Sequence, residues 1–93
     1  WYRGAISRKE AERQISTENL ETGTFLLRTS ESCPGSYVLT VRDHVDAIGL
    51  VVRHYKIRNM DNGGCYITYR QIFRTILKLI EYYKSEYLCL VPF

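Results

Sequence analysis

Short apolar runs rich in β-branched and aromatic residues alternate with turn-forming residues through the middle of the chain, a pattern typical of β-strands. The pattern predicts strands over residues 23–28, 37–42, 50–57 and 65–68. The Pro-Gly pair at 34–35 and the Asp-Asn-Gly-Gly run at 61–64 predict tight turns, and residues 43–49 are expected to form a loop. The first strand is apolar at both alternating sets of positions, so both faces of the sheet must be covered.

Two helices are predicted to supply that cover. Ser7-Arg8-Lys9-Glu10 has the form of a capping box, in which Ser7 caps the helix and the Glu10 side chain reaches back. A helix over residues 7–16 would bury Ala11 and Ile15. A second helix, from residue 69 or 70 to residue 84, would carry its apolar side chains on one face: Ile72, Phe73, Ile76, Leu77, Ile80 and Tyr83. The predicted fold is α+β, with a central antiparallel sheet and one helix on each face.

Length and composition fit one small domain. The chain has 93 residues, of which 45% are hydrophobic, so a single domain over residues 1–93 can fold around its own core. No apolar stretch is as long as a membrane span, and no insertion into a membrane is expected. The chain begins at Trp1 without an initiator Met, so we expect a module of a longer protein.

Cysteine spacing and charge exclude some classes of ligand. Cys33, Cys65 and Cys89 are odd in number and widely spaced, so neither a metal nor a disulfide framework is expected, and no cofactor is predicted. Free thiols favour a reducing compartment, the cytosol or the nucleus, and a cytoplasmic location is expected. The net charge of +3 favours an acidic ligand, but it is too small to indicate a nucleic-acid partner.

Arg28 is the main candidate for chemistry. It ends the strand over residues 23–28, where a buried guanidinium is costly unless it is paired. The residues that follow, Thr29 to Ser32, supply hydroxyls and backbone amides that can hold an anion. A phosphate matches the planar fork of donors two oxygens at a time. The alternative is that Arg28 pairs with an acidic side chain of its own chain, such as Glu10 or Glu31.

Side-chain alternation gathers further donors near Arg28. His54 and Lys56 share one face of the third strand, and that face can be the one that carries Arg28. Arg8, in the first turn of the first helix, could close the patch from above, and Val38 could form an apolar floor. A pocket with basic groups and apolar walls suits a phosphate that is carried on an aromatic ring.

Each of these residues also has a plain structural interpretation. His54 can be a core histidine, and Arg8 and Lys56 can be solvated surface charges. Tyr83 can belong to the core, and an ordinary polar turn can account for Ser30, Glu31 and Ser32. The coincidence of these residues, and no single one of them, indicates a site.

Five separated segments carry a family resemblance, in the right order and over nearly the whole chain: residues 1–8, 23–31, 36–41, 54–58 and 63–67. The resemblance is to the Src homology 2 domain, and in detail it is most similar to the domains of Src-type tyrosine kinases. It implies a non-catalytic module that binds phosphotyrosine-containing proteins or peptides and is expected to be monomeric.

The resemblance also implies roles for residues. Arg28 would hold two phosphate oxygens, and Arg8 and Lys56 would flank the phosphotyrosine ring. The phosphate loop would be completed by Ser30, Ser32 and the backbone amide of Glu31, while His54 would brace the pocket. A second pocket would take an apolar side chain three residues after the phosphotyrosine, and it would be lined by Tyr55, Ile67, Thr68, Tyr83 and Leu88.

Three departures from the Src-type pattern bear on these roles. Thr29 stands where that pattern has Glu, which removes a negative charge near the phosphate loop. The segment 84–87 is about two residues shorter and lacks a Gly, so one wall of the second pocket is altered. Cys65 replaces an aromatic residue, and we expect that change to be structural.

Two other functions are weighed against this interpretation. The spacing from Cys65 to Arg70 is one residue short of the cysteine-phosphatase pattern, and the phosphate-binding loop with a lysine found in nucleotide-binding proteins does not occur. Tyr37, Tyr55 and Tyr66 could stack on RNA bases, but the sequence motif of the common RNA-binding sheet is missing. A phosphate-cleaving enzyme and an RNA-binding module are therefore the alternatives that experiments must exclude.

Overall fold

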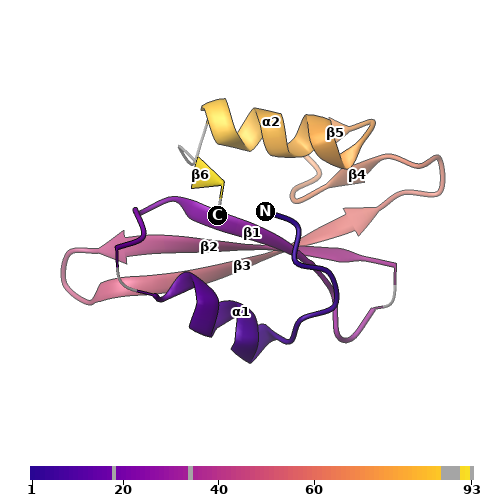
Figure 1. Cartoon of the computed structure of the whole chain (residues 1–93). Coiled ribbons are helices and arrows are strands. Elements are labelled where there is room, and N and C mark those ends of the chain that lie inside the picture. Colours follow the sequence, from indigo (N-terminus) through magenta and orange to yellow (C-terminus); the bar gives the residue numbers. More distant parts are fainter. Residues whose placement is uncertain (18, 34, 87–90, 93) are drawn as a thin grey trace.

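A six-stranded sheet lies between the two helices. The computed structural model describes residues 1–17, 19–33, 35–86 and 91–92. Its elements are α1 (Arg8–Ile15), β1 (Thr24–Thr29), β2 (Tyr37–Val45), β3 (Gly49–Asn59), β4 (Cys65–Tyr66), β5 (Ile72–Phe73), α2 (Ile76–Glu86) and β6 (Val91–Pro92). Figure 1 shows α1 and α2 on opposite sides of the sheet, so the predicted α+β architecture is confirmed.

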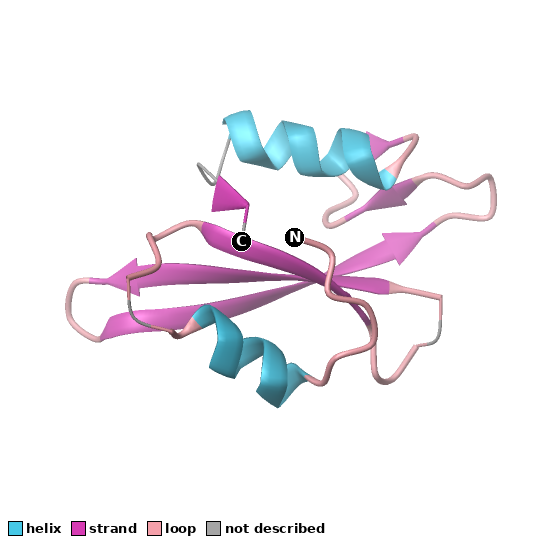
Figure 2. Cartoon of the chain, in the orientation of Figure 1, coloured by secondary structure: helices cyan, strands magenta, loops and turns pink. Residues whose placement is uncertain are grey.

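The strand order is β5-β4-β3-β2-β1-β6, and neighbours pair antiparallel from β5 through β1. β6 was not predicted, and it pairs parallel to β1 at the edge of the sheet. Figure 2 shows that β2 and β3 form the longest ribbon of the sheet. The long strands β1, β2 and β3 thus form the centre of a sheet that has one helix on each face.

The predicted loop over residues 43–49 is wrong for most of its length. β2 and β3 pair from Tyr37↔Ile57 as far as Val45↔Gly49, which leaves only a short turn. One polar residue of this segment, Asp43, has a side-chain partner across the ladder. The Asp43 carboxylate accepts a hydrogen bond from Arg53 Nε at 2.6 Å. A strand end of this kind carries no apolar alternation that a sequence pattern could reveal.

α1 begins and ends as predicted, but only half of the capping box forms. Ser7 Oγ accepts a hydrogen bond from the Glu10 amide at 3.0 Å. The Glu10 carboxylate does not return to Ser7, because it bonds Arg13 and Gln14 one turn later in the helix. The nearby Arg13 guanidinium, together with Gln14, lowers the pKa of Glu10 to about 2.

The second helix starts later than predicted. Residues 72–73 form β5, which pairs with β4, and the helix begins at Ile76, where the Thr75 hydroxyl accepts a hydrogen bond from the Lys78 amide at 3.2 Å. Leu77, expected on the buried face, is 58% exposed, and the buried residue is Leu79. Phe73 reaches the same core from a strand, which explains why its spacing imitates a helical face.

The sheet divides the interior into two cores. Ala11 and Ile15 are fully buried as predicted, and they pack on Leu26 on the α1 side. The larger core lies on the α2 side and contains Phe25, Leu27, Leu39, Val41, Ile57, Cys65, Phe73, Leu79, Ile80 and Tyr83. Cys65 thus has the structural position expected of it. Side-chain alternation along β1 places Arg28 with Leu26, on the face that α1 covers. No helix of the described chain has the length and apolarity needed to cross a membrane.

Candidate functional site

A hollow of about 230 Å³ opens on the α1 face of the sheet, and we call it the basic pocket. All of the residues predicted for a phosphate site line it: Arg8, Arg28, Ser30, Glu31, Ser32, Val38, His54 and Lys56. They come from α1, the three long strands and the turn after β1. The structure therefore brings the predicted set together around one space, while contact of each residue with a phosphate stays a prediction.

Arg28 is held by neutral neighbours inside the basic pocket. Only 3% of the residue is exposed, and its Nε donates to Thr40 Oγ1 at 3.3 Å. Its Nη2 lies 3.3 Å from His54 Nδ1. Burial lowers the pKa of Arg28, and the charge of Glu31 offsets that effect only in part. The guanidinium is therefore fixed in direction by two hydrogen bonds and keeps donors available.

The acidic partners considered for Arg28 are used elsewhere. Among the side chains that the structure describes, no carboxylate forms an ion pair with Arg28. Glu10 is bonded to Arg13 and Gln14, and a Glu31 carboxylate oxygen accepts a hydrogen bond from the Arg8 amide at the start of α1. A buried cation without a counter-ion is costly, so this arrangement favours an anion supplied from outside the chain.

His54 braces Arg28 through its neutral ring. A guanidinium can only donate, so His54 Nδ1 accepts, and the ring proton of the neutral form then sits on Nε2. Burial lowers the pKa of His54, the charges of Arg8 and Arg28 lower it further, and Glu12 opposes them. Nε2 has no hydrogen-bond partner in the described structure, and it lies 3.7 Å from Glu12 Oε1, which is too long for a hydrogen bond. His54 is thus a supporting residue that remains uncharged at neutral pH.

The turn after β1 holds its own shape and leaves donors free. The Ser30 amide donates to the Ser36 carbonyl at 2.8 Å, and the Cys33 amide donates to Ser30 Oγ at 3.2 Å. In the part of the chain that the structure describes, no hydrogen bond uses the amides of Glu31 and Ser32. Successive free amides in a turn form a concavity that binds anions.

Two cations stand at the rim of the basic pocket, each beside a partner on the protein. Arg8 Nε lies 3.6 Å from Glu12 Oε1, and Lys56 Nζ donates to Cys33 Sγ at 3.3 Å. Cys33 was not predicted as a site residue, although its place in the same turn as Ser30 and Ser32 is a signal that the sequence contains. Thr29 turns away from this rim, because its amide and hydroxyl both donate to the Gly4 carbonyl, at 3.0 and 3.4 Å.

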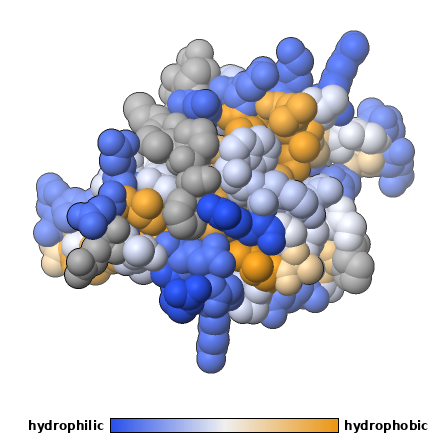
Figure 3. Space-filling view, in the orientation of Figure 1, coloured by the Kyte–Doolittle hydropathy of each residue, from blue (hydrophilic) through white to orange (hydrophobic). Residues whose placement is uncertain are grey.

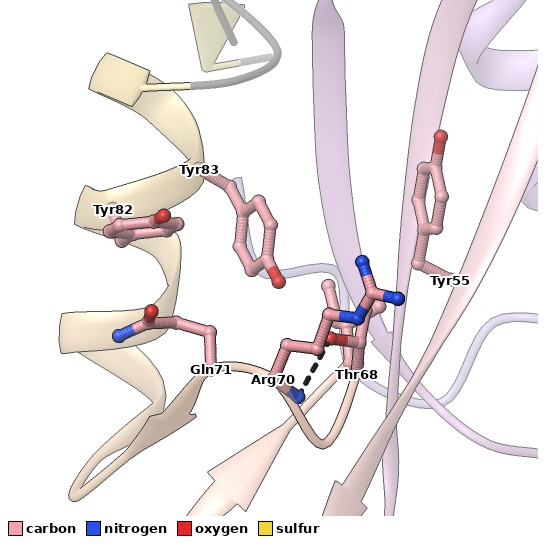
Figure 4. A pocket seen from close by; sticks show the side chains of 7 residues that line it. Tyr55, Thr68, Arg70, Gln71, Tyr82 and Tyr83 are labelled. Atoms are coloured by element: carbon pink, nitrogen blue, oxygen red, sulfur yellow. Dashed lines mark hydrogen bonds between the residues drawn. The ribbon is translucent and has the colours of Figure 1, made fainter.

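A second hollow, of about 420 Å³, lies on the α2 side of the sheet, and we call it the second pocket. Four of the residues predicted for it, Tyr55, Ile67, Thr68 and Tyr83, line it together with Arg70, Gln71 and Tyr82 (Figure 4). Leu88 lies outside the described residues, as does Tyr87 of the shortened segment. Figure 3 shows apolar side chains gathered over part of α2.

The later start of α2 explains why Arg70 and Gln71 were not predicted as site residues. Arg70 and Gln71 were assigned to a helix, but they belong to the loop before β5 and form a wall of the second pocket. The Arg70 amide donates to Thr68 Oγ1 at 3.1 Å, which fixes the turn of this loop. Figure 4 shows the Arg70 guanidinium between Thr68 and Tyr55, so the aromatic pocket has one cation at its edge.

Strand β3 separates the two pockets. His54 and Lys56 face the basic pocket, and Tyr55, which lies between them in sequence, faces the second pocket. The period of two along a strand thus produces two chemically different sites side by side. The described residues contain no cluster of His, Cys, Asp and Glu side chains that could hold a metal ion.

A comparison with known protein families agrees with this geometry. The family model described as the SH2 domain matches residues 1–83, which is most of the chain.

Proposed function

The chain belongs to the SH2 domain family of non-catalytic modules that bind phosphotyrosine peptides, and from this we propose how its two pockets divide the ligand. The basic pocket takes the phosphotyrosine. Arg28 binds two phosphate oxygens from below, and the amides of Glu31 and Ser32 bind from the turn after β1. Arg8 and Lys56 lie along the aromatic ring, and Val38 supports its apolar edge.

The second pocket takes an apolar side chain of the same peptide, at the third position after the phosphotyrosine. The peptide would run extended across β3, because each pocket opens on one side of that strand. Tyr55 and Tyr83 provide aromatic walls, and Ile67 adds an aliphatic one. Leu88 and the shortened 84–87 segment are assigned to the remaining wall by resemblance alone.

One observation carries the proposal: Arg28 is 97% buried at the base of an open hollow, and no carboxylate among the described side chains pairs with it. A structural arginine with this burial would have an acidic partner. An exchangeable dianion supplies the missing charge and accepts bidentate hydrogen bonds.

Calorimetry with three ligands tests the proposal. The expected result is binding of a phosphotyrosine peptide with isoleucine at the third following position, and no measurable heat from the unphosphorylated twin or from single-stranded RNA. Binding of RNA in place of the peptide would favour the module with strand aromatics. Release of inorganic phosphate from the peptide during the titration would favour the phosphate-cleaving enzyme.

The resemblance extends the proposal to the parent protein. We place the chain in a Src-type tyrosine kinase, acting as a monomeric module of cytoplasmic tyrosine-kinase signalling, without nucleic acid as a partner and without inserting into a membrane. Support comes from the sequence similarity of residues 54–58 and 61–68 and from the free thiols of Cys33 and Cys65.

A further inference from the structure

The thiol of Cys33 lies beside Lys56, one of the residues that line the basic pocket. Cys33 is partly exposed in the turn after β1, and its Sγ accepts a hydrogen bond from Lys56 Nζ at 3.3 Å. Lys56 lines the basic pocket, so a single ammonium contacts both the thiol and the space assigned to the ligand. Cys65 is different in every respect, since it is buried in the α2-side core and its burial raises the pKa of its thiol.

An anion-binding role for this location rests on more than the cysteine. Arg28 is nine-tenths or more buried, opens into the same hollow, and has no acidic partner in the described chain. Any negative charge that forms at Cys33 therefore competes with the ligand of that hollow for Lys56. The competition is a matter of geometry, because the contact between the sulfur and the ammonium is direct.

We propose that Cys33 is a redox-sensitive modification site that lowers the affinity of the basic pocket for phosphate by capturing Lys56. The inference rests on the proposed function, since it concerns the regulation of the same pocket. It adds a modification site, and a peroxide as the class of reactant, to a pocket for which we otherwise propose only ligand binding.

The hydrogen bond and the charge of Lys56 lower the pKa of the Cys33 thiol, which favours the nucleophilic thiolate. The thiolate sulfur attacks one oxygen of a peroxide: an S–O bond forms, the O–O bond breaks, and the second oxygen leaves as hydroxide. Sulfur is oxidised to a sulfenic acid while the peroxide is reduced. A second peroxide converts the sulfenic acid to a sulfinic acid and releases water, and the sulfinate is a fixed negative charge next to Lys56.

Reactivity is measured first, without any ligand. The folded chain and the urea-unfolded chain are treated with iodoacetamide at pH 7, and modification at each cysteine is followed by peptide mapping with mass spectrometry. We expect Cys33 to react faster in the folded chain, Cys65 to react more slowly, and Lys56→Gln to slow Cys33 in the folded chain. Equal rates for Cys33 in the folded and unfolded chains, or no effect of Lys56→Gln, would overturn the proposal.

Coupling to the pocket is measured with two reagents of nearly equal size. Iodoacetate leaves a negative carboxymethyl group on sulfur, like the charge of a sulfinate, and iodoacetamide leaves a neutral one. The carboxymethylated chain is expected to bind a phosphotyrosine peptide about fivefold more weakly than the carboxamidomethylated chain, the effect of one exposed ion pair. The Cys33→Ser chain, treated in the same way, should show no difference between the reagents, which excludes Cys65 and Cys89 as the cause.

Two further measurements complete the test. Phosphotyrosine in excess should slow the alkylation of Cys33, because a phosphate that engages Lys56 draws the ammonium away from the sulfur and leaves less of the reactive thiolate. Treatment with hydrogen peroxide should give the sulfinic acid at Cys33 and the weaker binding of the carboxymethylated chain. If the untreated chain binds the peptide but both alkylated forms bind equally, the coupling is wrong and the proposed function stands. If the untreated chain binds no phosphopeptide while Cys33 is still activated by Lys56, the proposed function fails and this proposal fails with it.

Discussion

The two pockets lie on either side of one strand, yet they are built in opposite ways. The basic pocket rests on side chains that are fixed inside the sheet, with Arg28 bonded to Thr40 and placed against His54. The second pocket is larger, and it is walled by a loop and by one face of α2. The first is specified by a few directional bonds, whereas the second is specified by shape and apolar area. We therefore expect the first to respond sharply to single atoms and the second to tolerate change.

Replacing Arg28 is expected to have the largest effect. Arg28→Ala should cost on the order of 2–5 kcal/mol of binding free energy, because the phosphate charges lose their buried partner. Arg28→Lys should fail nearly as badly, since a point charge cannot form two parallel hydrogen bonds in the place of a planar fork. Titration calorimetry with a phosphotyrosine peptide measures both losses.

Arg53→Ala is the matched control for this prediction. Arg53 is a cation on β3 that pairs with Asp43 and lines neither pocket. Its removal lowers the net charge as Arg28→Ala does, and the affinity should stay within about twofold of the unaltered chain, as expected for an exposed charge away from the site. Near-normal binding by Arg28→Lys would show that charge alone is enough and would remove the contrast between the pockets.

The second pocket is expected to show a smaller and graded effect. Changing isoleucine to alanine at the third peptide position should cost about 1–3 kcal/mol, the value of a few methyl groups in an apolar pocket. Tyr83→Ala in the domain should remove most of that difference between peptides, because Tyr83 forms part of the wall. The same two peptides titrated into both chains give the coupling energy directly.

A peptide library offers an independent check on the second pocket. Absence of any preference at the third position would show that the shortened 84–87 segment closes it. Arg70 at the edge of the pocket introduces a charge that a wholly apolar site would lack, so a carboxylate near the third position should be favoured over a lysine.

The contrast between the basic pocket and the second pocket also separates what the sequence could predict from what it could not. Strand alternation and the cost of a buried charge are local rules, and they allowed Arg28, His54 and Lys56 to be grouped around one space, where the structure has them. The second pocket depends on where α2 begins, and that boundary is set by the pairing of β4 with β5 and by the Thr75 cap. Apolar spacing cannot distinguish Phe73 in a strand from a helical residue, so Arg70 and Gln71 were not found. Tyr82 was missed for another reason: it lies in the predicted helix, but outside the spacing of the predicted apolar face. β6 pairs with β1 although most of the sequence separates the two strands, and no local rule predicts such a pairing.

Lowering the pH should weaken phosphate binding in the basic pocket and leave the contribution of the second pocket unchanged. The phosphate takes its second proton near pH 6, so affinity should fall as the pH drops from 7 to 5. His54 does not reverse this trend at first, because its pKa is lowered from 6.5 and its protonation begins at a more acid pH than usual. The ratio between the isoleucine and alanine peptides should stay constant over the same range, since the side chain that we propose for the second pocket carries no titratable group.

A difluorophosphonate analogue of phosphotyrosine is the control for acidity. Its second ionisation lies at lower pH, so its loss of affinity should be displaced toward acid while the protein remains the same. If both ligands weaken at the same pH, a group on the protein, and not the second ionisation of the phosphate, is responsible for the loss.

The smallest expected effect is a gain in affinity for phosphopeptide, produced by Glu31→Gln. Glu31 lines the basic pocket with a negative charge, and its carboxylate accepts a hydrogen bond from the Arg8 amide. A dianion entering the pocket is repelled by that charge, whereas the amide oxygen of Glu31→Gln can still accept from Arg8. We expect Glu31→Gln to bind phosphopeptide about twofold to fivefold more tightly, as for one exposed charge pair. The gain should shrink at high salt, because exposed charges are screened over about 10 Å at 0.1 M ionic strength.

Glu10→Gln, which removes a charge engaged with Arg13 outside the pocket, should leave affinity unchanged. Weaker binding by Glu31→Gln would mean that the carboxylate orders the phosphate loop more than it repels the ligand, and the basic pocket would then owe its affinity to preorganisation as well as to charge.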